Sequence, residues 1–133
     1  MSSVPLYVTD THSLLWYLGG SPKLSSKAKQ AFDEAHAGRA KIIVPIIVVA
    51  ELIFLVEKGR AKVDVNAIVG KIVREHNYEV APLGLGQIQL LKKLIQIPEM
   101  HDRLIACEAL LWKAKLITAD VQLRYAGIVE VVW

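Results

Sequence analysis

The chain has 133 residues, with 16 Lys and Arg against 13 Asp and Glu, and a formal net charge of +3 at pH 7. This length suits a single domain, residues 1–133, with a sizeable core, and 22% charged residues argue against a disordered chain. Apolar residues make up 53%, an excess that indicates surface meant for a partner or for a second copy of the chain. The mildly basic charge permits nucleic-acid binding without establishing it.

Three features bear on location. The single cysteine, Cys107, cannot form an internal disulfide, which fits a reducing, cytoplasmic setting. The first five residues lack the basic segment of a signal peptide. The longest apolar run is interrupted by Pro45 and Glu51 and is too short to span a bilayer, so we expect no membrane contact.

Strand-like and helix-like patterns alternate along the chain. Short apolar segments bounded by turn residues predict strands at residues 6–9, 41–44, 78–83, 116–118 and 128–133. Helical spacing and capping residues predict helices at residues 11–18, 25–37, 46–58, 65–73, 85–95 and 102–112. The 46–58 helix is apolar on every side, so we expect it to be buried. The alternation predicts an α/β fold whose mainly parallel sheet of about five strands is covered on both faces.

Two acidic residues lie in unusually apolar surroundings. Asp10 is the only charged side chain between Met1 and Lys23, and Glu51 is the only ionisable group between Lys41 and Glu57. A buried carboxylate without a partner costs several kcal/mol or takes up a proton. We therefore expect something to compensate each charge, and a divalent cation shared by several acids would do so.

Two further acids are expected at the same place. Asp10 directly follows the first predicted strand, and Asp120 directly follows the fourth. Ligands of open α/β sheets bind at the carboxyl ends of the strands. Glu51 lies two turns into the helix after the second strand, and Asp102 opens a helix, so these four acids are expected to converge.

All-oxygen ligation favours Mg²⁺ or Mn²⁺ over zinc. Four neighbouring carboxylates stay ionised together only if cations lie among them. Such ions activate water and stabilise the leaving oxygen of a phosphodiester. The residues thus predict metal-assisted phosphodiester hydrolysis.

The chain resembles the PIN-domain ribonucleases, and among them the VapC toxins of type II toxin–antitoxin pairs. The matching stretches span almost the whole chain in the same order: Asp10-Thr11-His12-Ser13-Leu14-Leu15-Trp16, Glu51 in its apolar helix, His101-Asp102-Arg103-Leu104-Ile105-Ala106, Leu116-Ile117-Thr118-Ala119-Asp120 and the Val-Val-Trp end. The family's frequent Asp-Pro-Phe-Asp form is absent, and Glu99, three residues before Asp102, is the nearest additional acid.

The resemblance implies an α/β/α sandwich and endonucleolytic cleavage of RNA that depends on Mg²⁺ or Mn²⁺. It implies a metal site made of Asp10, Glu51, Asp102 and Asp120. Thr118 would orient a carboxylate or a water, and Glu99 is a further candidate. The partners it implies are an RNA substrate, a VapB-like antitoxin and a second copy of the chain.

Simpler interpretations stay open for individual residues. Asp10, Asp102 and Asp120 are also suited to cap helices, and Glu51 to pair with a distant Lys or Arg. Arg103 either contacts a phosphate or neutralises a neighbouring acid. The cations Lys23, Lys27, Lys29, Arg39, Arg60 and Lys62 are candidates for RNA contact, with a solvated surface as the simpler interpretation. Two other functions compete: an aspartyl-phosphate phosphohydrolase with Asp10 as nucleophile, and a non-catalytic binding module with an acidic cleft.

Overall fold

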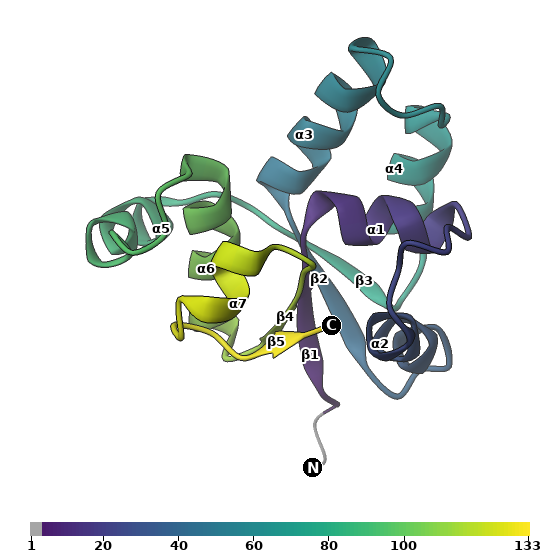
Figure 1. Cartoon of the computed structure of the whole chain (residues 1–133). Helices are drawn as coiled ribbons and strands as arrows, with labels where there is room; N and C mark the ends of the chain where they lie inside the picture. Colours follow the sequence, from purple (N-terminus) through teal and green to yellow (C-terminus); the bar gives the residue numbers. More distant parts are fainter. Residues whose placement is uncertain (1–3) are drawn as a thin grey trace.

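The computed structural model describes residues 4–133 and contains one sheet of five parallel strands in the order β3-β2-β1-β4-β5 (Figure 1). The strands are β1 (Leu6–Thr9), β2 (Lys41–Pro45), β3 (Tyr78–Ala81), β4 (Lys115–Ile117) and β5 (Val131–Val132). The predicted α/β class with a five-stranded parallel sheet is confirmed. The expected lack of a signal peptide concerns in part residues 1–3, which lie outside the described residues.

Helices connect the strands and lie on both sides of the sheet (Figure 1). They are α1 (Thr11–Leu18), α2 (Ser26–His36), α3 (Ile46–Glu57), α4 (Val65–Arg74), α5 (Leu85–Leu90), the 3₁₀ turn η1 (Leu91–Lys93), α6 (Met100–Trp112) and α7 (Val121–Tyr125). The chain builds outward from β1 through β2 to β3 and then returns to β4 on the other side of β1. The strand order therefore reverses between β1 and β4, which is where ligands bind in open α/β sheets.

The three central strands are buried on both faces. Val8, Ile43 and Ile117 have no exposed surface, and each belongs to a nearly continuous apolar run. Parallel strands covered by helices on both sides show this pattern rather than an alternation of polar and apolar residues. The rigid centre of the sheet fixes the positions of the residues that directly follow its strands.

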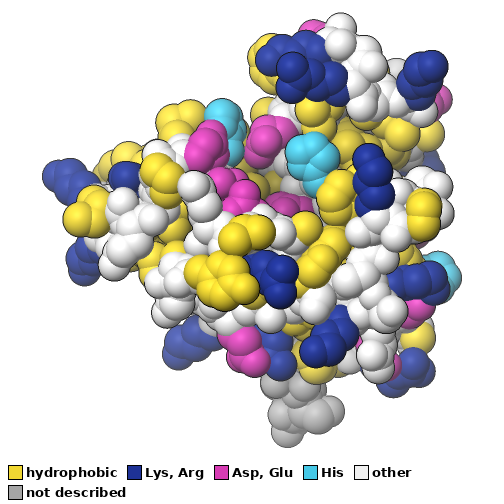
Figure 2. Space-filling view, in the orientation of Figure 1, with side chains coloured by type: hydrophobic (Ala, Val, Ile, Leu, Met, Phe, Trp, Pro, Cys, Tyr) yellow, Lys and Arg dark blue, Asp and Glu magenta, His cyan; other side chains and the backbone are white. Residues whose placement is uncertain are grey.

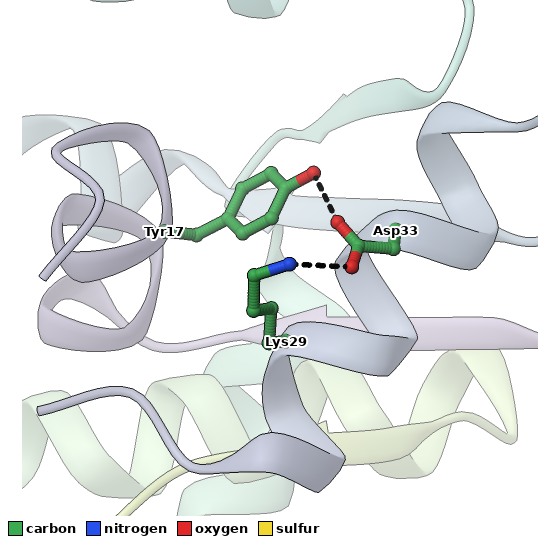
Figure 3. Close-up of polar contacts among 3 residues, drawn as sticks. All are labelled: Tyr17, Lys29 and Asp33. Carbon is green, nitrogen blue, oxygen red and sulfur yellow. Dashed lines mark hydrogen bonds and ion pairs between the residues drawn. The ribbon is translucent and has the colours of Figure 1, made fainter. Parts of the chain in front are cut away.

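A polar contact fixes α1 against α2 (Figure 3). Tyr17 donates a hydrogen bond to Asp33 at 3.0 Å, Lys29 pairs with the other oxygen of Asp33 at 2.8 Å, and the Tyr17 ring stacks on Phe32 at 4.5 Å. Burial and the neighbouring Asp33 raise the pKa of Tyr17 to about 12, so the phenol stays a neutral donor. The contact holds the helix that begins immediately after Asp10.

The prediction that residues 46–58 form a buried helix is wrong about burial. Only Val48 and Leu52 of α3 are buried, and Phe54 is 60% exposed. The helix packs one side against α1, α4 and α6, and within residues 4–133 its other side, with Ile46, Ile53 and Phe54, stays exposed. Its apolar residues therefore form a surface rather than a core.

The predicted 85–95 helix is also corrected. The chain forms the short helix α5 and then η1, and no residue of either is buried. Leu85 is 70% exposed and Ile95 is 71% exposed, whereas Leu94 is buried. The predicted strands 78–83 and 128–133 are shorter than expected, because hydrogen-bonded pairing ends at Ala81 and covers only Val131–Val132. Within residues 4–133, no helix has the length and apolar character needed to cross a membrane.

Candidate functional site

The carboxyl ends of β1 and β4 open into a cavity of about 480 Å³. Its lining residues are Asp10, Thr11, His12, Trp16, Glu51, Glu99, Asp102, Ile105, Ala119 and Asp120. Figure 2 shows Asp and Glu side chains gathered in one hollow of the surface with histidines at its rim. The structure thus brings together all four acids singled out in the sequence, together with Glu99, the further candidate.

Asp10 reaches the cleft from the end of β1. It caps α1, because its Oδ1 accepts a hydrogen bond from the Ser13 backbone N–H at 2.9 Å. Its Oδ2 accepts from the Thr118 hydroxyl at 2.5 Å. The capping interpretation of Asp10 is therefore correct as geometry, and the residue also faces the other acids.

Thr118 links the two acids that follow the strands. It is fully buried, donates to Asp10, and its Oγ1 accepts from the Asp120 backbone N–H at 3.0 Å. Asp120 in turn caps α7, a helix that the sequence analysis did not predict, by accepting from the Leu123 N–H at 3.0 Å. Thr118 thus orients Asp10 directly and Asp120 through the backbone.

Glu99, rather than Asp102, caps α6. Its Oε2 accepts from the Asp102 N–H at 2.7 Å, and its Oε1 contacts His101 Nδ1 at 2.5 Å. Desolvation raises the pKa of Glu99, but the hydrogen bonds from His101 and the Asp102 backbone outweigh it and lower that pKa overall. The hydrogen bond between the Glu99 and His101 side chains also raises the pKa of His101. Asp102 lies inside the first turn of α6, so its carboxylate is not used as a cap.

Glu51 lacks the partner that a buried acid needs. Its Oε1 is buried without a hydrogen-bond partner, as is Thr11 Oγ1, and Glu51 belongs to no ion pair within residues 4–133. Burial raises the pKa of Glu51, and the charge of His101 and the nearby Thr11 hydroxyl oppose that rise only in part. The salt-bridge interpretation of Glu51 is therefore wrong in this structure.

Every other acid in the cleft affects the pKa of Asp102. Its pKa is raised to about 6, first by desolvation and then by the charges of Asp120, Glu99, Glu51 and Asp10. Its carboxylate accepts no hydrogen bond from residues 4–133. The hydrogen bond to Glu99 is donated by the Asp102 backbone N–H and does not involve the carboxylate. A half-buried, unpaired carboxylate among like charges is the arrangement that a bound cation stabilises.

The donor set fits a hydrated magnesium or manganese ion better than a tightly ligated zinc. Among residues 4–133, no three His, Cys, Asp or Glu side chains are grouped closely enough to ligate one ion together. Magnesium keeps several waters and is bound through one or two carboxylates plus substrate phosphate. The cavity has room for such water, and the carboxylates that line it offer acceptors.

Arg103 pairs with no acid within residues 4–133, so it does not neutralise a neighbouring carboxylate. Its guanidinium donates to the backbone carbonyls of Ile97 and, at 3.5 Å, Leu91, so it holds the segment between η1 and α6. The sequence analysis missed Thr11, whose buried hydroxyl lies next to Glu51, and the pairing of His101 with Glu99. The signal for Thr11 was its place directly after Asp10, in the first turn of α1.

Comparisons with known proteins agree with this architecture. The sequence model of the PIN domain matches residues 7–128. No curated protein sequence matches the chain. Among solved structures, the chain is similar to VapBC2 from Rickettsia felis bound to a DNA fragment of its promoter, with a TM-score of 0.70, 18% identity, and coverage of 95% of this chain and 96% of that one.

Two further structures share the fold. A toxin–antitoxin complex from Klebsiella pneumoniae matches with a TM-score of 0.67 and 19% identity, covering 96% of each chain. FitAcB from Neisseria gonorrhoeae matches with a TM-score of 0.66 and 15% identity, covering 94% of this chain and 95% of that one.

Proposed function

The chain belongs to the PIN-domain family, whose members are generally nucleases, and from this premise we propose that it is an Mg²⁺- or Mn²⁺-dependent endoribonuclease. The observation that carries the proposal is the convergence of five carboxylates in the cleft beyond β1 and β4, with Glu51 and Asp102 unpaired. Acids that have no protein partner and repel one another are suited to hold a hard cation and, through it, a phosphodiester.

Each acid has a proposed task. Asp10 and Asp102 hold the main ion, and Asp120 holds it through a bound water. Glu51 holds a second ion or accepts the proton of the attacking water. The bound ion supplies charge neutralisation at the scissile phosphate and at the leaving oxygen. Thr118 positions Asp10 through its 2.5 Å hydrogen bond, and Glu99, already engaged with His101, shapes the rim of the cleft.

We propose that the nuclease is the toxin of a type II toxin–antitoxin pair and works in the cytoplasm with a VapB-like antitoxin. The Rickettsia felis and Klebsiella pneumoniae structures that share its fold are toxin–antitoxin complexes, which supports this choice. An Arg of the antitoxin placed in the acidic cleft would take the position of the cation.

The proposal is tested by incubating the purified, partner-free chain with a panel of labelled RNAs. We expect cleavage in millimolar MgCl₂ or MnCl₂ and none in EDTA. RNA loss that is independent of metal would come from a contaminating nuclease. No cleavage of any RNA with either metal would favour the non-catalytic binding module, whose acidic cleft would then bind a basic peptide.

The aspartyl-phosphate phosphohydrolase receives less support from the sequence around Asp10. The second acid that such sites usually carry two residues later is replaced by His12.

We also propose that a second copy covers the apolar side of α3. Phe54→Arg should then convert a dimer into a monomer, because burying one Phe contributes about 1.5–3 kcal/mol and a twofold interface buries two. Light scattering coupled to gel filtration measures the change. Tyr125→Arg, on α7 and 80% exposed, is the matched control and should leave the dimer intact. A wild-type chain that is monomeric throughout would contradict this assignment.

A further inference from the structure

A second cavity, of about 490 Å³, adjoins the acidic cleft. Its lining residues are His12, Leu15, Trp16, Lys23, Leu55, Arg60, Ala61, Lys62 and Val63, and we call it the basic groove. His12 and Trp16 line both cavities, so the basic groove continues from the cleft. It extends along α1 to the connection between α3 and α4.

The basic groove has a charge opposite to that of the cleft. Three cations line it, Lys23, Arg60 and Lys62, and no Asp or Glu does. All three are exposed, and none takes part in an ion pair within the part of the chain that the structure describes. Lys29 and Arg39 differ, since each pairs with a carboxylate of α2 at 2.8 Å. The groove cations are therefore available to an external anion.

Aromatic surface lies where the basic groove meets the cleft. The half-buried Trp16 ring lies 5.7 Å from the His12 ring at an angle of 47°, and 5.9 Å from Trp133 at 56°. The tilted contacts leave part of the indole on the walls of both cavities. Unpaired bases stack on such faces, whereas bases inside a duplex are already stacked on one another.

We propose that the basic groove binds the single-stranded nucleotides that flank the scissile phosphate, an inference that rests on the proposed ribonuclease function. The phosphates contact Lys23, Arg60 and Lys62, and a base stacks on Trp16. The acidic cleft repels a polyanion unless a cation is bound there, so the neighbouring cations anchor the strand. Figure 2 shows Lys and Arg side chains beside a histidine at the rim of the acidic hollow.

The test replaces all three groove cations with glutamine, as Lys23→Gln, Arg60→Gln and Lys62→Gln together. The matched control replaces Lys92, Lys93 and Lys113 with glutamine, residues that are exposed, unpaired within residues 4–133 and outside both cavities. We expect the groove variant to raise KM for a single-stranded RNA by roughly tenfold or more, and by more than kcat falls. Its salt dependence should weaken by about 0.7 in slope for each lost phosphate contact. The control should keep the wild-type KM and slope, and thermal melting checks both folds.

Binding of a short fluorescent single-stranded RNA in EDTA separates this inference from the function. Suppose that the wild type binds this RNA, the groove variant does not, and the wild type cleaves no RNA in Mg²⁺. This result would overturn the ribonuclease proposal and leave the groove assignment standing. If the groove variant cleaves RNA with the wild-type KM and salt slope, the groove assignment alone is overturned. Equal affinity for the matching RNA duplex would overturn the single-strand preference.

Discussion

Asp102→Asn should reduce Mg²⁺-dependent RNA cleavage by about 10³-fold or more, since a catalytic cation supplies several kcal/mol of charge stabilisation and each 1.36 kcal/mol is tenfold in rate. The substitution tests the site cleanly, because the Asp102 carboxylate accepts no hydrogen bond from residues 4–133 and lies inside the first turn of α6 rather than at its cap. Asn has the same shape, so the loss would come from the missing charge. Cleavage of a labelled RNA at saturating Mg²⁺ measures it.

Glu51→Gln should behave in the same way, and Glu57→Gln provides its control on the same helix. Glu57 is exposed and lies outside the cleft. Asp10 and Asp120 are less suitable for this test, because each caps a helix and its removal also costs about 1 kcal/mol of stability. If both Asp102→Asn and Glu51→Gln cleave RNA at the wild-type rate, the metal-site assignment is wrong.

The position of the cleft follows from the order of strands and helices. Asp10 and Asp120 come after strands whose apolar runs are easily recognised, and parallel strands end at one edge of a sheet. Glu51 was identified because an acid inside an apolar helix is costly. These arguments use only local sequence and chain order, so they can be made from a single sequence.

Burial could not be predicted for α3 and α5. Hydropathy shows that a side chain avoids water, but not which element covers it. Phe54 and Leu85 are as apolar as the core residues, and both stay exposed because no other part of residues 4–133 packs on them. The capping role of Glu99 also escaped prediction, since the sequence around Asp102 offered Asp102 itself as the cap of this helix.

Glu108 shows why an acid in an apolar setting does not by itself indicate a metal. It is 3% exposed on α6 and outside the cleft. Gln87 donates to one of its oxygens at 2.6 Å and Trp112 to the other at 3.1 Å. Neutral donors thus satisfy this carboxylate and connect α5 to α6. Asp102 has no such donor, and the Thr11 hydroxyl beside Glu51 offsets only part of the effect of burial on its pKa; this difference supports the metal assignment.

Without metal, the contribution of Asp102 to the stability of the wild-type protein should fall as the pH rises from about 4 to about 6. The pKa of Asp102 is 3.8 in the unfolded reference and about 6 in the fold, raised by desolvation and by the other acids. Between these values the folded state holds a proton that the unfolded state has released, so the free energy of unfolding falls with rising pH. Two pKa units correspond to about 3 kcal/mol, which solvent screening at this half-exposed group reduces to about 1–2 kcal/mol. Burial raises the pKa of Glu51 as well, and this acts in the same direction.

Asp102→Asn should therefore be more stable than the wild type in EDTA at pH 7, and equal to it near pH 4. Urea unfolding at both pH values gives the difference, which cancels contributions from acids elsewhere in the chain. Mg²⁺ should reverse the order at pH 7, because an ion at a hundredfold excess over its Kd adds about 2.7 kcal/mol to the form that binds it. Glu57→Gln should follow the wild type in every condition. If Mg²⁺ stabilises Asp102→Asn as much as the wild type, the cation is held elsewhere, and the repulsion among the cleft acids needs another explanation.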